Sequence, residues 1–170
     1  MDRLQSHEKN YEECIFCRIV RNDLSSRKIY EDNHSIAILD INPLTEGHCL
    51  VIPKRHVQWF YDLSDNEICY LFKATKKVTL NLKKKLRTDV VSMIVRGLRI
   101  QHAHIILIPS SKEDIISKLF SLLDATQGYP PSNKESLDEK VDKLRSAVLS
   151  FSSKDLKDRL NANEDRLKKI

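Results

Sequence analysis

Two histidines, His102 and His104, are separated by one residue in the run HAHIILIP. If this run forms a β-strand, both side chains lie on the same face, because side chains alternate along a strand. Neutral imidazole is both a nucleophile and a metal ligand. The pair is therefore a candidate for either chemistry, although two surface histidines would give the same pattern.

Cys14 and Cys17 form a C-x-x-C pair near the start of the sequence. In a reducing compartment such a pair is either half of a metal site or a redox pair. Two thiolates at this spacing supply half of the ligands in many tetrahedral zinc sites. The other two cysteines, Cys49 and Cys69, lie within apolar patterns, so we expect them to be small buried residues.

Short apolar runs predict the strands that position these residues. We expect strands at about 28–30, 36–39, 48–52, 90–95 and 103–108. Ser64 and Glu67 form a capping box, and apolar residues recur on one helical face after them. This pattern predicts a helix from about 65 to 86. The fold class is therefore α+β, with a mainly antiparallel sheet of about five strands packed by one long helix.

Charge and hydropathy exclude several classes of protein. Of the 170 residues, 41% are hydrophobic and 31% are charged, which is typical of soluble globular proteins. No apolar run approaches the roughly 20 residues of a membrane helix, and the polar N-terminus does not resemble a signal peptide. We therefore expect a cytoplasmic protein with no membrane partner. A net charge of +5 suits an anionic ligand but is too small to argue for nucleic acid.

The composition also predicts three parts along the chain. We expect a flexible leader at 1–12, the main domain at 13–110 and a helical C-terminal extension at 111–170. A stretch near 127–133 is rich in Gly, Pro and polar residues and predicts a linker within the extension. The extension has a narrow apolar stripe with charged flanks, which makes it a candidate surface for a protein partner.

Four motifs, taken together with their order and spacing, resemble the histidine triad (HIT) family. They are CIFCRIV, LDINP, EGHCLVIPKRH and HAHIILIP. The resemblance covers about Cys14 to Pro109 and extends to the branch of the family with an N-terminal C-x-x-C. It implies the HIT-like α+β fold and a homodimer whose sheets join across the subunits.

The resemblance implies roles for residues at the matching positions. His104 would be the covalent nucleophile toward the α-phosphate of a nucleotide, with His48 close to it. Asp40 would accept hydrogen bonds from the ribose hydroxyls, although the residues alone favour a turn residue that ends a strand. Ile41 would pack near the base, and His102 would belong to the same nucleotide site.

The resemblance also implies a structural zinc ion. Cys14 and Cys17 need two further ligands to complete a tetrahedral site, and His56 and His102 are available. The resemblance implies that family members with this N-terminal pair bind zinc through the matching positions. An unoccupied pair of thiols is the alternative. No metal is implied in the chemistry itself.

The match to the family fails at two places. The third triad position is Ile106, and an isoleucine neither donates a hydrogen bond to phosphate nor transfers a proton. The Asn and small residues that the family has before its histidines are replaced by a short connection at 96–101. Within it, Arg96 and Arg99 either bring positive charge to the phosphate or are exposed hairpin residues.

Two functions are consistent with these residues. In the first, the chain is a hydrolase or nucleotidyl transferase acting on a purine nucleotide derivative through a nucleotidyl-histidine, as phosphoramidases and dinucleoside polyphosphate hydrolases do. In the second, it is a catalytically degenerate nucleotide-binding or scaffold protein with structural zinc and an interaction tail. Ile106 and the short connection favour the second, whereas His104, His48 and Asp40 favour the first. A zinc-dependent nucleic-acid binder ranks last, because interleaved aromatics and a basic helix are lacking.

Overall fold

The part of the chain described by the computed structural model consists mainly of one domain and the first turns of the C-terminal extension. The described residues are 14–95, 97, 99–112, 114–126, 140–142, 144–146 and 148. The expected leader at 1–12 and the linker near 127–133 lie outside them, as does Arg96. The chain divides into two compact units, Met1–Lys118 and Leu119–Ile170.

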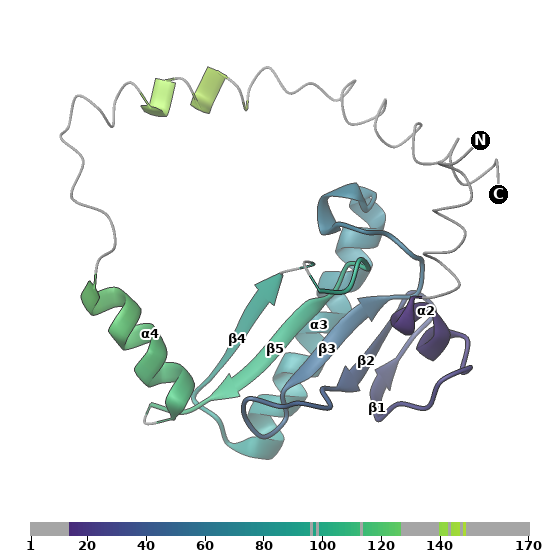
Figure 1. Cartoon of the computed structure of the whole chain (residues 1–170), viewed down its shortest axis with the longest axis horizontal. Coiled ribbons are helices and arrows are strands. Elements are labelled where there is room, and N and C mark those ends of the chain that lie inside the picture. Colours follow the sequence, from purple (N-terminus) through teal and green to yellow (C-terminus); the bar gives the residue numbers. More distant parts are fainter. Residues whose placement is uncertain are drawn as a thin grey trace. The chain divides into compact units, whose positions relative to one another are not determined.

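A five-stranded sheet forms the centre of the first unit (Figure 1). Its strands are β1 (Lys28–Glu31), β2 (Ser35–Leu39), β3 (Cys49–Pro53), β4 (Val90–Val95) and β5 (Ile105–Ser110). The order across the sheet is β1-β2-β3-β5-β4, and every neighbouring pair is antiparallel. The predicted α+β fold with an antiparallel sheet is confirmed, and β3 and β5 are neighbours near its middle.

The last strand begins later than its apolar pattern predicted. It was expected from 103, but β5 starts at Ile105 and continues to Ser110. The reason is that the backbone N–H of Ala103 donates to the carbonyl of Val57, in the loop after β3, at 2.6 Å. His102 and His104 therefore precede the strand, and the connection from β4 to β5 covers 96–104 instead of 96–101.

The long helix α3 (Asp65–Leu86) begins at the predicted capping box. The Ser64 hydroxyl accepts a hydrogen bond from the N–H of Glu67, and the Glu67 carboxylate accepts one from the N–H of Ser64 at 2.8 Å. Arg55 donates two further hydrogen bonds to the same carboxylate. These contacts fix the start of α3 to the loop that follows β3.

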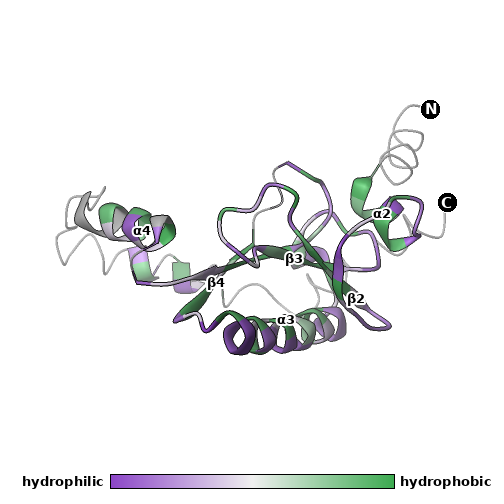
Figure 2. Ribbon diagram, turned by 90° about the horizontal axis from the view of Figure 1, so that it is seen from below, coloured by the Kyte–Doolittle hydropathy of each residue, from purple (hydrophilic) through white to green (hydrophobic). Residues whose placement is uncertain are grey.

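Separate apolar clusters cover the two faces of the sheet, with α3 on one face and the short helix α2 (Ile15–Val20) on the other (Figure 2). The cluster under α3 consists of Ala37, Cys49, Val51, Val57, Leu63, Leu71, Ala74, Val78, Ala103, Ile105 and Leu107. The cluster under α2 consists of Cys14, Phe16, Cys17, Ile19, Ile36, Ile38, Leu50 and Ile52. Ile106 packs against the second cluster, because alternate side chains of β5 face opposite sides.

Further predictions concerned cysteines and the remaining helices. Cys49 is buried as predicted, but Cys69 is exposed, so the prediction that it is buried was wrong. Cys69 lies two residues before the buried Leu71 on α3, which is about 200° around the helix and therefore on its outer side. A helix was expected after Pro109, and α4 covers Ile115–Thr126. Among the described helices, none has the length and apolar character needed to span a membrane.

The capping box is expected to contribute measurably to stability. Ser64→Ala removes the oxygen that accepts from the N–H of Glu67 and should lower the free energy of unfolding by about 1 kcal/mol. Asn66→Ala changes an exposed residue of the same helical turn and is the matched control, with an expected change below about 0.5 kcal/mol. Chemical denaturation measures both values, and equal losses would contradict the prediction.

Glu67 should also make stability depend on pH. Burial raises the pKa of its carboxyl group, but hydrogen bonds from Arg55 and Ser64 outweigh burial and lower the pKa from 4.5 to about 2. A lowered folded-state pKa stabilises the folded protein above pH 4.5, and this contribution is lost as the pH falls from 4.5 toward 2. Glu67→Gln should therefore flatten the unfolding free energy over this range, and an unchanged slope would argue against it.

Candidate functional site

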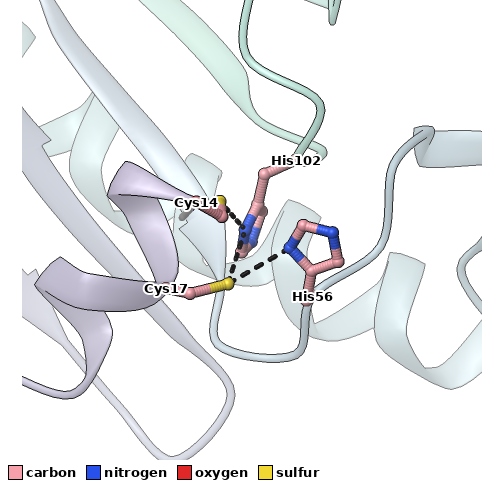
Figure 3. Close-up of side chains that lie close together, drawn as sticks. All are labelled: Cys14, Cys17, His56 and His102. Carbon is pink, nitrogen blue, oxygen red and sulfur yellow. Dashed lines mark hydrogen bonds between the residues drawn. The ribbon is translucent and has the colours of Figure 1, made fainter. Parts of the chain in front are cut away.

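Four potential metal ligands from three segments meet on the α2 side of the sheet (Figure 3). Cys14 caps α2 and Cys17 lies in its first turn, whereas His56 follows β3 and His102 precedes β5. Their ligand atoms all lie within 4.8 Å of one another. The structure thus brings together the four residues that were predicted to bind zinc.

The distances between these atoms suit a tetrahedral zinc site. The Sγ atom of Cys17 is 3.1 Å from Nδ1 of His56 and 3.5 Å from Nδ1 of His102. The Sγ atom of Cys14 is also 3.5 Å from Nδ1 of His102. With zinc–sulfur bonds of about 2.3 Å and zinc–nitrogen bonds of about 2.0 Å, the sulfur–nitrogen edges of a tetrahedron are about 3.5 Å. The donor set and its spacing therefore fit zinc.

His102 is oriented for this role by its second ring nitrogen. Nε2 donates a hydrogen bond to the carbonyl of Pro53 at 2.9 Å, which leaves the lone pair of Nδ1 facing the two thiols. Metal-binding histidines commonly donate their other N–H to a carbonyl in this way. His102 is completely buried, with an exposed fraction of 0%. Its predicted part in nucleotide binding gains no support here, because both ring nitrogens are engaged inside the protein.

The two thiols are electrostatically coupled. The hydrogen bond from Cys17 lowers the pKa of Cys14 against the opposing effect of burial, and His102 and His56 lower it further. The same hydrogen bond and burial raise the pKa of Cys17. The pair therefore loses its first proton readily, and thiolate is the form of cysteine that binds metal ions.

His104 lies next to the metal cluster in sequence and on the same face of the sheet. Its Nδ1 atom donates a hydrogen bond to the carbonyl of His102 at 2.7 Å, so the lone pair is on Nε2. Burial lowers the pKa of His104, although the bond to His102 and the carboxylate of Asp40 oppose this effect. The ring packs edge-on against Phe16, with the centroids 5.3 Å apart. The lowered pKa favours the neutral imidazole, and the hydrogen bond to His102 orients its ring; a nitrogen nucleophile requires the neutral form.

His48 and Asp40 lie at the opposite end of β3, where β2 ends. The N–H of Leu44 donates to Nδ1 of His48 at 3.1 Å, so the proton of this imidazole is on Nε2. Among the described residues nothing accepts a hydrogen bond from that buried N–H, and the nearest Asp40 oxygen is 3.7 Å away. Burial lowers the pKa of His48, and Asp40 partly offsets the change.

Three further residues considered for the site are Ile41, Ile106 and Arg96. Ile41 follows Asp40 and is 79% exposed, so its side chain is accessible to a ligand. Ile106, in β5, is partly buried against the cluster under α2. The proposed role of Arg96 cannot be compared with the structure, because Arg96 is outside the described residues.

A cavity of about 250 Å³ beside His104 has an aromatic lining that was not predicted. Its walls come from the loop after β3 and from the connection between β4 and β5. The described lining residues are Gln58, Trp59, Phe60, Tyr61, Val95, Gly97, Ala103 and His104. Three consecutive aromatic residues were visible in the sequence, but their spacing does not indicate that the loop folds back to the histidines.

Comparison with known proteins identifies the family. The HIT domain model matches residues 21–113. A HIT-like protein of Methanocaldococcus jannaschii is 39% identical over 59% of this chain and 81% of its own length. The adenosine 5'-monophosphoramidase of Schizosaccharomyces pombe is 36% identical over 72% of this chain and 89% of its own. A zinc-bound histidine triad protein from Mycobacterium smegmatis is 26% identical with a TM-score of 0.59, covering 81% of this chain and 99% of that structure. The chain belongs to the HIT family.

The cluster of cysteines and histidines is expected to hold zinc in the purified protein. Elemental analysis after purification without added metal should find about one zinc per chain. Cys14→Ser should lower both the zinc content and the melting temperature, because metal binding is coupled to folding when the ligands come from separate segments. Cys69→Ser changes an exposed thiol outside the cluster and should alter neither. A metal-free protein of unchanged stability would exclude the site.

Proposed function

We propose that this HIT protein is a hydrolase or nucleotidyl transferase that acts on the α-phosphate of a purine nucleotide derivative. The observation that supports this most is His104, a buried imidazole whose Nδ1 is bonded to the His102 carbonyl and whose Nε2 lone pair is the nucleophile. The relative from Schizosaccharomyces pombe, named as an adenosine 5'-monophosphoramidase, supports this class of substrate.

The proposed reaction has two steps. In the first, Nε2 of His104 forms a bond to the α-phosphorus while the bond from phosphorus to the leaving group breaks. The leaving group departs with the electron pair of that bond and takes a proton from water. In the second step, a water oxygen forms a bond to phosphorus, the bond to His104 breaks, and the proton of the water passes to solvent. A transferase would replace water with another acceptor.

Asp40, Ile41 and His48 bind the nucleoside part of the substrate in this proposal. The Asp40 carboxylate accepts hydrogen bonds from the ribose hydroxyls, and exposed Ile41 offers an apolar surface to the base. The Nε2–H of His48 is buried without a described acceptor, which is costly unless a ligand supplies one. A substrate oxygen near His104 would supply it.

The zinc ion, when bound by Cys14, Cys17, His56 and His102, supplies a structural cross-link and takes no part in the chemistry. The backbone carbonyl of His102 accepts the hydrogen bond from His104. The cluster therefore holds in place the residue that orients the nucleophile.

A second function, a catalytically degenerate nucleotide-binding or scaffold protein, is favoured by Ile106. This side chain packs against the apolar cluster under α2 and has no group to protonate a leaving group. Such a protein would keep the zinc and the fold and would bind a partner through its C-terminal extension. Homodimer formation, implied by the family resemblance, stays a prediction under both functions.

Hydrolysis of an adenosine phosphoramidate with a good leaving group distinguishes the two functions. We expect weak activity, because a missing positioned acid costs about 10² to 10⁴ in rate and good leaving groups need little protonation. His104→Ala should abolish the activity, because it removes the nucleophile. Ile106→His should increase it, most for poor leaving groups.

His34→Ala is the matched control, because His34 is a histidine stacked on Tyr70 outside the site, and its loss should leave the rate unchanged. If wild type and His104→Ala are equally inactive but bind AMP, the protein is a nucleotide binder. If AMP does not bind to the wild-type protein at all, the scaffold function is supported instead.

A further inference from the structure

We propose that the cavity beside His104 binds an aromatic leaving group, so that this protein acts preferentially on nucleotide derivatives whose α-phosphorus bears an aryl amine. This inference rests on the proposed function, because it assigns a substrate class to the same reaction. Three consecutive aromatic residues line this cavity: Trp59, Phe60 and Tyr61.

The cavity and the residues proposed to bind the nucleoside lie at opposite ends of β3. His48 comes directly before β3, whereas the aromatic residues follow its end. The pairing of Val51 with Ile105 places His104 near the end of β3 from which the aromatic loop continues. During attack by Nε2 of His104 the leaving group points away from that nitrogen, because the attacking and leaving atoms are roughly in line through phosphorus. With the nucleoside directed toward Asp40, we assign the leaving group to the cavity that extends from His104 to the aromatic residues.

The aromatic side chains are arranged as stacking partners. The rings of Trp59 and Tyr61 are nearly parallel, at 12°, with centroids 6.0 Å apart. Phe60 meets Tyr61 edge-on at 71°, with centroids 5.5 Å apart. Aromatic rings pair in both geometries at about 4.5 to 7 Å, with a gain beyond area burial. A benzene ring is known to occupy an apolar cavity of about 150 Å³, so a cavity of about 250 Å³ admits an aryl group.

The lining also has little to offer a charged leaving group. Among the described lining residues, Gln58 contributes an amide, and none is a lysine, arginine or carboxylate. Within the described lining a polyphosphate leaving group would meet no lysine or arginine, whereas an uncharged aryl amine would not need one. Ile106 favours the same choice, because an aryl amine leaves with less help from an acid than an alkyl amine does.

Gly97 keeps the cavity open beside Trp59. A Cβ atom at this position would lie 3.3 Å from two atoms of the indole ring, Cε3 and Cζ3. Even the smallest side chain at 97 would therefore press on Trp59. A substitution at Gly97 therefore alters the cavity while Trp59, Phe60, Tyr61 and His104 all keep their identities.

The test compares three ligands on the full chain: AMP, adenosine 5'-phosphoranilidate and its cyclohexylamine counterpart. Trp59 is the only tryptophan in the sequence, so its fluorescence reports occupancy of the cavity without requiring turnover. We expect the anilidate to bind about five- to tenfold more tightly than the cyclohexyl compound and to change the emission of Trp59. AMP, which has no leaving group, should bind without that change.

Trp59→Leu should remove the preference for the anilidate and leave the affinity for AMP within about twofold. Phe72→Leu, at an exposed aromatic position of α3 outside the cavity, is the matched control and should keep the preference. If Trp59→Leu does not fold, as judged by circular dichroism, Gly97→Ala decides instead. It retains the fluorescent reporter and should weaken binding of the anilidate while sparing AMP.

Three results would overturn the proposal. If AMP binds but wild type does not distinguish the two amidates, the cavity is not an aryl site, and the proposed function survives. If Trp59→Leu or Gly97→Ala weakens AMP as much as the anilidate, the cavity holds the nucleoside instead. If none of the three ligands binds, the proposed function fails and this assignment fails with it.

Discussion

The carbonyl of His102 accepts the hydrogen bond from Nδ1 of His104, and the rest of the site depends on where this carbonyl lies. The side chain of His102 points away from that bond and into the metal cluster, with its remaining N–H donated to Pro53. One residue thus fixes both a ligand position and the tautomer of its neighbour. Displacing His102 would disturb the cysteines and the orientation of His104 together, because backbone and side chain move as one unit.

The cluster of Cys14, Cys17, His56 and His102 lies outside the strands. Cys14 and Cys17 lie at the start of α2, His56 follows β3 and His102 precedes β5. Ladder hydrogen bonds pair β3 with β5, whereas His102 comes before the paired part of β5. A zinc ion bound by the four residues, as proposed, would tie His102 to the start of α2 and to the loop after β3.

Patterns within a few residues of the sequence predicted where helices and strands lie. They did not predict which side of an element faces the sheet or which distant segments come into contact. The capping box of Ser64 fixed the start of α3 because both of its hydrogen bonds form within three residues. The four candidate metal ligands, which the structure brings together, were predicted because the C-x-x-C spacing and the family motifs are local as well. Cys69 was misassigned, since an apolar neighbourhood in sequence does not say which side of a helix faces the sheet. The aromatic cavity was missed because it depends on Trp59 meeting Gly97, a contact between distant segments that no short pattern encodes.

The substitution at Ile106 and the aromatic lining of the cavity act on the same step of the proposed reaction. A site with a positioned acid accepts poor leaving groups, because the acid supplies the proton that they lack. A site with isoleucine there depends on the leaving group's own ability to depart. The selectivity of the reaction then depends on recognition of the leaving group instead of on proton transfer to it. In this chain the surface that we propose for that recognition is the cavity lined by His104, Trp59, Phe60 and Tyr61. On this proposal, isoleucine at position 106 is consistent with a narrowed substrate range as well as with lost catalysis.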